Sequence, residues 1–116
     1  MGIIAITSNN VNHASQYVKI LESMGANTKV ITPENNDTLH ETMHDTSAIL
    51  LSDGPRVWSS LESPEAKISD DDIMNVELDE FELNVTRKAL DIDLPILAIG
   101  RGLHILNICQ GGKPPL

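Results

Sequence analysis

Residues 94–112 read LPILAIGRGLHILNICQGG, and the order of residue types in this stretch decides the fold class. Pro95 introduces an apolar run over residues 96–99, which is typical of a short strand covered on both faces. Gly100 follows at the turn position, and residues 102–109 have the apolar spacing of a helix. A buried strand, a sharp turn and a helix together predict an α/β protein with a parallel sheet. Many such proteins place a nucleophile or a phosphate at this turn, whereas glycine offers no side chain.

The rest of the chain repeats the alternation of strand and helix. Three more apolar runs predict strands at residues 2–7, 28–32 and 47–52. Three helices are predicted: one capped by Asn10 or Asn12, with Val18, Ile20, Leu21 and Met24 as its apolar face and Gly25 as its end, and two others at residues 37–45 and 78–90. We therefore expect residues 1–116 to form one domain, a flavodoxin-like sheet of about four parallel strands with helices on both faces.

The segment before the last predicted strand is strongly acidic. Residues 54–78 form a long connection that contains SDDD at residues 69–72, which predicts a solvated loop or a segment that docks a partner. In the helix at 78–90, Asp79, Glu80 and Glu82 are expected near the N-terminus and Arg87 and Lys88 near the C-terminus, where they complement the helix dipole. Its apolar contacts are expected from Phe81, Leu83, Val85 and Leu90.

Composition excludes several classes of function. Eight Lys and Arg against seventeen Asp and Glu give a net charge of −9, which would repel a phosphate backbone, so we expect no nucleic-acid partner. No apolar run approaches the roughly 20 residues that span a bilayer, and residues 1–9 lack the basic start of a signal peptide. A single cysteine excludes an internal disulfide and fits a reducing compartment. These features predict a cytoplasmic protein without membrane insertion.

The stretch PILAIGRGLHILNICQGG resembles the nucleophile-elbow segment of class I glutamine amidotransferase-like proteins, in particular their γ-glutamyl hydrolase branch, the peptidase C26 group. The chain retains the family's residues at ten positions of this segment: Pro95, Ile96, Ala98, Ile99, Arg101, Gly102, Leu103, Asn107, Gly111 and Gly112. AILLSDGP at residues 48–55 similarly resembles the family's strand followed by its glycine-rich oxyanion loop. The resemblance implies the N-terminal half of an amidotransferase-like domain, truncated before the second half.

Three departures from the family pattern decide the expected function. The position of the family's nucleophilic cysteine is occupied by Gly100 in this chain, so no thiolate is available to form a thioester. The family's partner His and Glu belong to the second half, outside residues 1–116. The oxyanion loop becomes Ser52, Asp53 and Gly54, which places a carboxylate where the developing oxyanion needs N–H donors. We therefore expect no glutaminase or γ-glutamyl hydrolase activity, and we expect glycine to relax the once-strained corner.

The emptied pocket beside this corner is the candidate site. We assign it Asp53, Gly54, Gly100, Arg101, Gly102 and His104, with no catalytic residue among them. Arg101 is interpreted as structural, and His104 as a packing or capping residue or as a pocket residue. A γ-glutamyl or amide compound is one ligand that such a pocket could take. Cys109, among apolar helix residues, is expected to be a buried structural thiol.

Two other motifs offer alternatives. HETMH at residues 40–44 matches H-E-x-x-H, so His40 and His44 could bind zinc with Glu41 as base and Glu62 or Glu65 as a third ligand. A solvated helix face is the interpretation we favour, and we assign no metal and no cofactor. Gly100 and Gly102 form a G-x-G, but the third position of a dinucleotide fingerprint is Ile105.

The leading hypothesis is a catalytically inactive amidotransferase-like protein that serves as a structural or regulatory subunit. An uncovered strand edge and apolar surface predict a homo-oligomer or a subunit of a larger complex. The alternatives are a γ-glutamyl or amide hydrolase-related enzyme, a small-molecule binder at the elbow pocket, and a zinc site at HETMH.

Overall fold

The computed structural model describes residues 2–9, 11–53 and 70–112, with only the backbone of residues 70–75. Four parallel strands form one sheet in the order β2-β1-β3-β4. The strands are β1 (Ile3–Thr7), β2 (Asn27–Ile31), β3 (Thr46–Leu51) and β4 (Ile96–Ala98). The helices are α1 (Ser15–Ser23), α2 (Leu39–Thr42), α3 (Asp70–Asp91) and α4 (Arg101–Cys109), with short 3-10 helices η1 (Val11–Ala14) and η2 (Pro33–Thr38). The flavodoxin-like parallel sheet expected from the sequence is confirmed.

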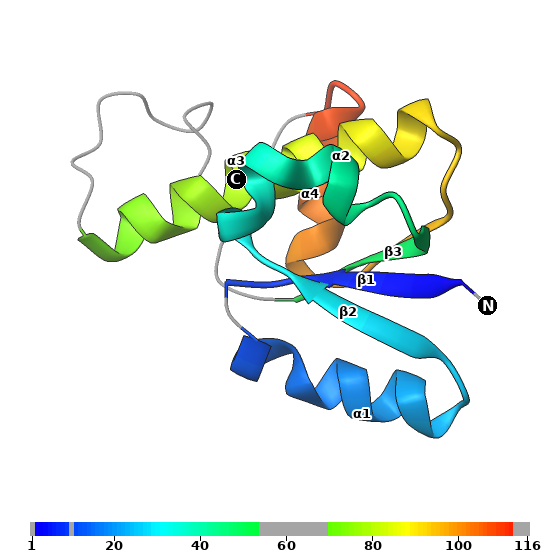
Figure 1. Ribbon diagram of the computed structural model, residues 1–116. Coiled ribbons are helices and arrows are strands. Elements are labelled where there is room, and N and C mark those ends of the chain that lie inside the picture. The colour runs from blue at the N-terminus through cyan, green and yellow to red at the C-terminus, as the bar shows by residue number, and fades with distance from the viewer. Residues whose placement is uncertain (1, 10, 54–69, 113–116) are drawn as a thin grey trace.

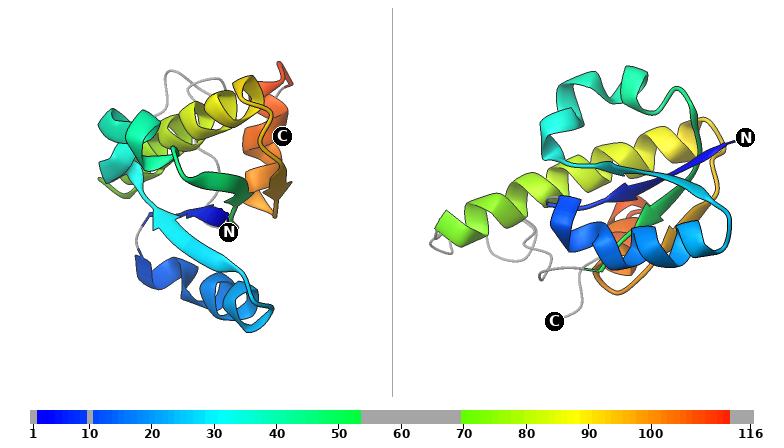
Figure 2. Two further views of the ribbon diagram at one scale, coloured as in Figure 1. Left: turned by 45° about the vertical axis from the view of Figure 1, so that its right-hand side comes forward. Right: turned by 60° about the horizontal axis from the view of Figure 1, so that its bottom comes forward.

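The helices lie on both faces of the sheet, which explains the nearly continuous apolar strands. Figure 1 shows α1 beneath the sheet, whereas α2, α3 and α4 lie above it, and Figure 2 shows the same layers from two other sides. The larger core lies on the α3 side, where Phe81 and Val85 pack with Ile49, Leu51 and Ile105. The smaller core lies on the α1 side and centres on Ile6, Ala14 and Leu50.

Helix α1 differs in two respects from its expected pattern. It begins after the 3-10 turn η1 with Ala14 as the N-cap and no side-chain cap, so Asn12 lies inside η1 and does not cap the helix, while Asn10 lies outside the described residues. Val18 and Leu21 pack on the core as expected, but Ile20 and Met24 are exposed because they face away from the sheet. The predicted stop at Gly25 is confirmed by its φ of +91°.

Helix α3 begins at Asp70, eight residues earlier than the predicted helix at 78. The long loop is therefore shorter than expected, and its remaining residues 54–69 lie outside the described residues. Asp79, Glu80 and Glu82 stand in the middle of the helix and so cannot serve its first turn. Leu90, predicted as an apolar contact, is 37% exposed because it lies on the outer side of the helix.

Among the residues that the structure describes, no helix covers one part of the sheet. Leu97 of β4 is paired with Leu50, and both side chains lie on the α1 face of the sheet. Helix α1 contacts β2, which is at the other edge of the sheet from β4. Leu97 is 60% exposed, and a groove of about 180 Å³ lies beside it, lined among others by Ile4, Leu21 and Leu50. The outer edge of β4 has no strand partner within the described part of the chain. Among those same residues, no helix is long and apolar enough to cross a membrane.

Candidate functional site

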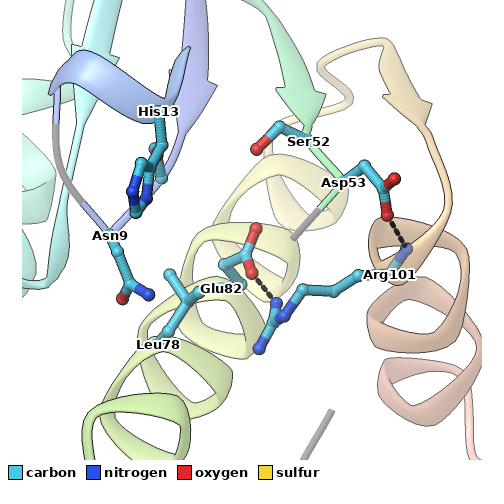
Figure 3. Close-up of a pocket in the computed structure, with 8 residues that line it drawn as sticks. Asn9, His13, Ser52, Asp53, Leu78, Glu82 and Arg101 are labelled. Atoms are coloured by element: carbon cyan, nitrogen blue, oxygen red, sulfur yellow. Dashed lines mark hydrogen bonds and ion pairs between the residues drawn. The ribbon is translucent and has the colours of Figure 1, made fainter. Parts of the chain in front are cut away.

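The turn between β4 and α4 is built around Gly100. Its φ of +52° and ψ of −114° place it in a region that side-chain-bearing residues rarely adopt, whereas glycine adopts it at little steric cost. A Cβ at this position would stand 2.1 Å from Oδ1 of Asp53. The same Asp53 oxygen accepts a hydrogen bond from the backbone N–H of Arg101, at 3.2 Å (Figure 3). The first backbone N–H after the turn is thus already hydrogen-bonded to a carboxylate.

Gly102 has a packing role. A Cβ there would stand 2.4 Å from the carbonyl oxygen of Leu51 and 2.7 Å from its Cβ, so only glycine lets α4 approach β3 this closely. Gly102, the second glycine of the G-x-G, therefore allows α4 to pack closely on β3. The group that approaches this glycine is the backbone of Leu51 and not a phosphate.

Arg101 is the centre of a buried ionic cluster, which we call the Arg101 cluster: Arg101, Asp79, Glu82 and Thr7. The guanidinium donates through Nη1 to Glu82 and through Nη2 to Asp79, and the Thr7 hydroxyl donates to the other oxygen of Glu82. The three charged side chains are between 1% and 6% exposed. Burial lowers the pKa of Arg101 to about 10, so the guanidinium stays protonated at neutral pH. The cluster joins α4 to α3 and β1.

A cavity of about 240 Å³ lies beside this cluster, at the carboxyl ends of β1 and β3. Ser8 and Asn9 follow β1, and Ser52 and Asp53 follow β3, so both strand ends supply polar groups to its wall. The Ser52 hydroxyl donates to the carbonyl oxygen of Thr7 at 2.6 Å, which joins the two strand ends. In open parallel sheets, ligands bind at the point where the strand order reverses, which here lies between β1 and β3.

The cavity contains only part of the site expected from the sequence. Asp53 and Arg101 line it, whereas Gly100, Gly102 and His104 do not. His104 is half-buried on α4, and Gly54 lies outside the described residues. Cys109, expected to be buried, is a free thiol that is only half-buried because it stands at the last residue of α4.

Sequence reasoning missed the residues that complete the site. Asp79 and Glu82 were expected at a solvated helix start, but they are buried and bind Arg101. Their spacing of three residues places both on one helix face, together with the buried Thr86, and this was the available signal. Ser8, which lines the cavity, had no such signal because it only follows a strand.

The HETMH segment does not form the helix that a zinc site needs. Helix α2 ends at Thr42, so His44 lies beyond it, and Nδ1 of His40 lies 3.0 Å from Nζ of Lys88. Within residues 2–9, 11–53 and 70–112, no three His, Cys, Asp or Glu side chains gather as a metal would require. The residues expected as third ligands, Glu62 and Glu65, lie outside that range.

The fold and the turn together define a class of protein: a flavodoxin-like α/β domain with a strand–turn–helix elbow that carries glycine at the turn. Within that class, the chain belongs to the Peptidase C26 family, whose match covers residues 4–114.

Glutamine amidotransferase-like proteins are similar to this chain over most of its length. One from Rickettsia prowazekii is 32% identical over 88 residues, which cover 72% of this chain and 30% of that protein. The protein YvdE of Lactococcus lactis subsp. lactis is 28% identical over 108 residues, which cover 90% of this chain and 44% of YvdE. Its homologue in subsp. cremoris is 28% identical over 107 residues, 90% of this chain and 55% of that protein. The chain thus matches about a third to a half of the length of these relatives.

The Arg101 cluster predicts a large and pH-dependent effect of substitution. Arg101→Met leaves two buried carboxylates without their cation, and such a loss costs about 3–5 kcal/mol of unfolding free energy. The pKa values of both carboxyls then rise in the folded state, so the loss of stability shrinks as the pH falls from neutral toward acid. Urea unfolding measures both effects.

The matched control is Arg87→Met, because Arg87 is exposed on the same helix as the two carboxylates and donates a hydrogen bond to the side chain of Asn84 at 3.3 Å. It should change the free energy of unfolding by about 0.5 kcal/mol or less. Equal losses in the two variants would contradict a structural role for the Arg101 cluster.

Proposed function

We propose that this chain is a catalytically inactive glutamine amidotransferase-like domain that acts as a structural or regulatory subunit through protein–protein contacts. The observation that carries the proposal is the Asp53–Arg101 hydrogen bond at an elbow whose turn residue is Gly100. Hydrolysis through a thioester needs a nucleophile at the turn and N–H donors for the oxyanion. Here the turn has no heteroatom, and the amide that follows it is already bonded to a carboxylate.

Electrostatics supports the same conclusion. An oxyanion developing at the corner would lie beside the Asp53 carboxylate, and like charges at such short distances oppose each other by several kcal/mol where water is limited. The Arg101 guanidinium cannot offset this repulsion, because Asp79 and Glu82 already take both of its terminal nitrogens. The arginine therefore supports the fold, and the corner favours neutral or positive groups.

The uncovered part of the sheet supports a role in protein contacts. The groove beside Leu97 is apolar and borders the outer edge of β4, which has no strand partner within residues 2–9, 11–53 and 70–112. Another chain commonly pairs with a strand edge that lies next to apolar surface. We assign this surface to a second copy of the chain, since edge-to-edge pairing about a twofold axis would cover both copies of the groove at once.

The catalytic part of the proposal is tested with γ-glutamyl p-nitroanilide. The wild-type protein should release nitroaniline no faster than buffer, because the glycine at the turn offers no nucleophile. Turnover by the wild-type protein would contradict the proposal and favour a hydrolase-related enzyme. Zinc-dependent turnover that is lost in His40→Ala would favour the metal alternative.

The contact surface is tested by light scattering at micromolar concentration. The wild-type protein should form a dimer, and Leu97→Asp should be monomeric because a charge in the groove cannot be buried without a partner. Ile20→Asp is the control, since Ile20 is 57% exposed on α1, away from that edge, and its variant should remain dimeric. A monomeric wild-type protein, or the same mass for both variants, would overturn this assignment.

A further inference from the structure

The cavity at the ends of β1 and β3 has a charge balance that selects among ligands. Its wall contains the carboxylates of Asp53 and Glu82 and the guanidinium of Arg101, and Asp79 lies directly behind the guanidinium. Three carboxylates against one cation leave the region with a net charge of about −2, within a protein of net charge −9. An anionic ligand would enter against this field.

Arg101 itself does not provide an anion site, although an arginine in a pocket often does. Its Nη1 and Nη2 donate to Glu82 and Asp79, so its positive charge is already paired with two carboxylates of the protein. Its third nitrogen, Nε, is buried and has no hydrogen-bond partner among the residues described, while the side chain is 2% exposed. A single buried N–H of this kind is satisfied by a neutral oxygen such as a hydroxyl or carbonyl.

The position of the cavity points to a ligand independently of its charges. It lies where the strand order reverses, and the side chains that surround it come from two strand ends, η1, α3 and the start of α4. Figure 3 shows Arg101 extending from α4 toward Glu82, opposite Asn9 and His13. The volume of about 240 Å³ is larger than the 150 Å³ or so that holds a benzene ring, so a small organic molecule fits.

From this combination we propose that the cavity binds a small primary ammonium compound that also carries a hydroxyl or carbonyl oxygen. The ammonium group binds the Asp53 carboxylate, one of whose oxygens is still free of the Arg101 amide bond, and the neutral oxygen accepts from Nε of Arg101. This site is separate from any docking at the β4 edge, so its test is independent of the proposed subunit role.

The test is an NMR titration of the ¹⁵N-labelled wild-type chain with three two-carbon probes at constant ionic strength: ethanolamine, glycolate and ethylene glycol. Ethanolamine carries the ammonium and the hydroxyl, glycolate reverses the charge, and ethylene glycol has no charge. We expect ethanolamine to shift the amide signals of Ser8, Ser52 and Arg101 saturably. Glycolate and ethylene glycol should bind at least about tenfold more weakly, because each lacks the charged hydrogen bond.

Two variants with the same change of charge locate the contact. Asp53→Asn keeps an oxygen for the Arg101 amide but removes the charge, and it should raise the dissociation constant of ethanolamine about tenfold. Asp91→Asn is the control, because Asp91 is exposed about 13 Å farther along α3 than Glu82, and it should leave the constant unchanged. No saturable shift with ethanolamine, equal binding of glycolate, or equal effects of the two variants would each overturn the proposal.

Discussion

The ion pairs of Arg101 are the constraint on which the rest of the structure depends. Arg101 is the first residue of α4, and its two carboxylate partners stand one turn apart on α3. A buried charge without a partner costs several kcal/mol, so the two helices can pack in only one register along each other. Thr7 extends the constraint to the end of β1 through Glu82. The carboxyl end of the sheet is thereby fixed as one unit.

That constraint explains how an elbow persists without a nucleophile. Gly102 lets α4 pack directly on Leu51, and Gly100 supplies the positive φ that the turn requires. Both features serve the connection between strand and helix whether or not chemistry occurs there. The Asp53 carboxylate then accepts a hydrogen bond from the Arg101 amide, which satisfies a donor at the start of α4 that its own helix cannot pair. We therefore interpret the corner as an element of architecture.

Much of the fold could be predicted from the sequence, because apolar runs and glycine stops report the strands and their connections directly. The site was harder to predict, because Asp79 and Glu82 resemble ordinary surface acids until the start of α3 is known. Because α3 begins at Asp70, Asp79 and Glu82 lie in the middle of the helix, where they are buried, and not in its first turn. Ile20 and Met24 were misassigned for a related reason: apolar spacing identifies a helix but does not say how wide its buried face is.

The most direct measurement of the central claim is the pH dependence of the Arg101 backbone amide signal in ¹⁵N-labelled protein, compared with Asp53→Asn. If the Asp53 carboxylate holds this amide, acidification that neutralises the carboxylate shifts the signal, and that shift disappears in the variant. An Arg101 amide that is insensitive to pH, or that titrates identically in the variant, would contradict the account and leave the amide open to an oxyanion.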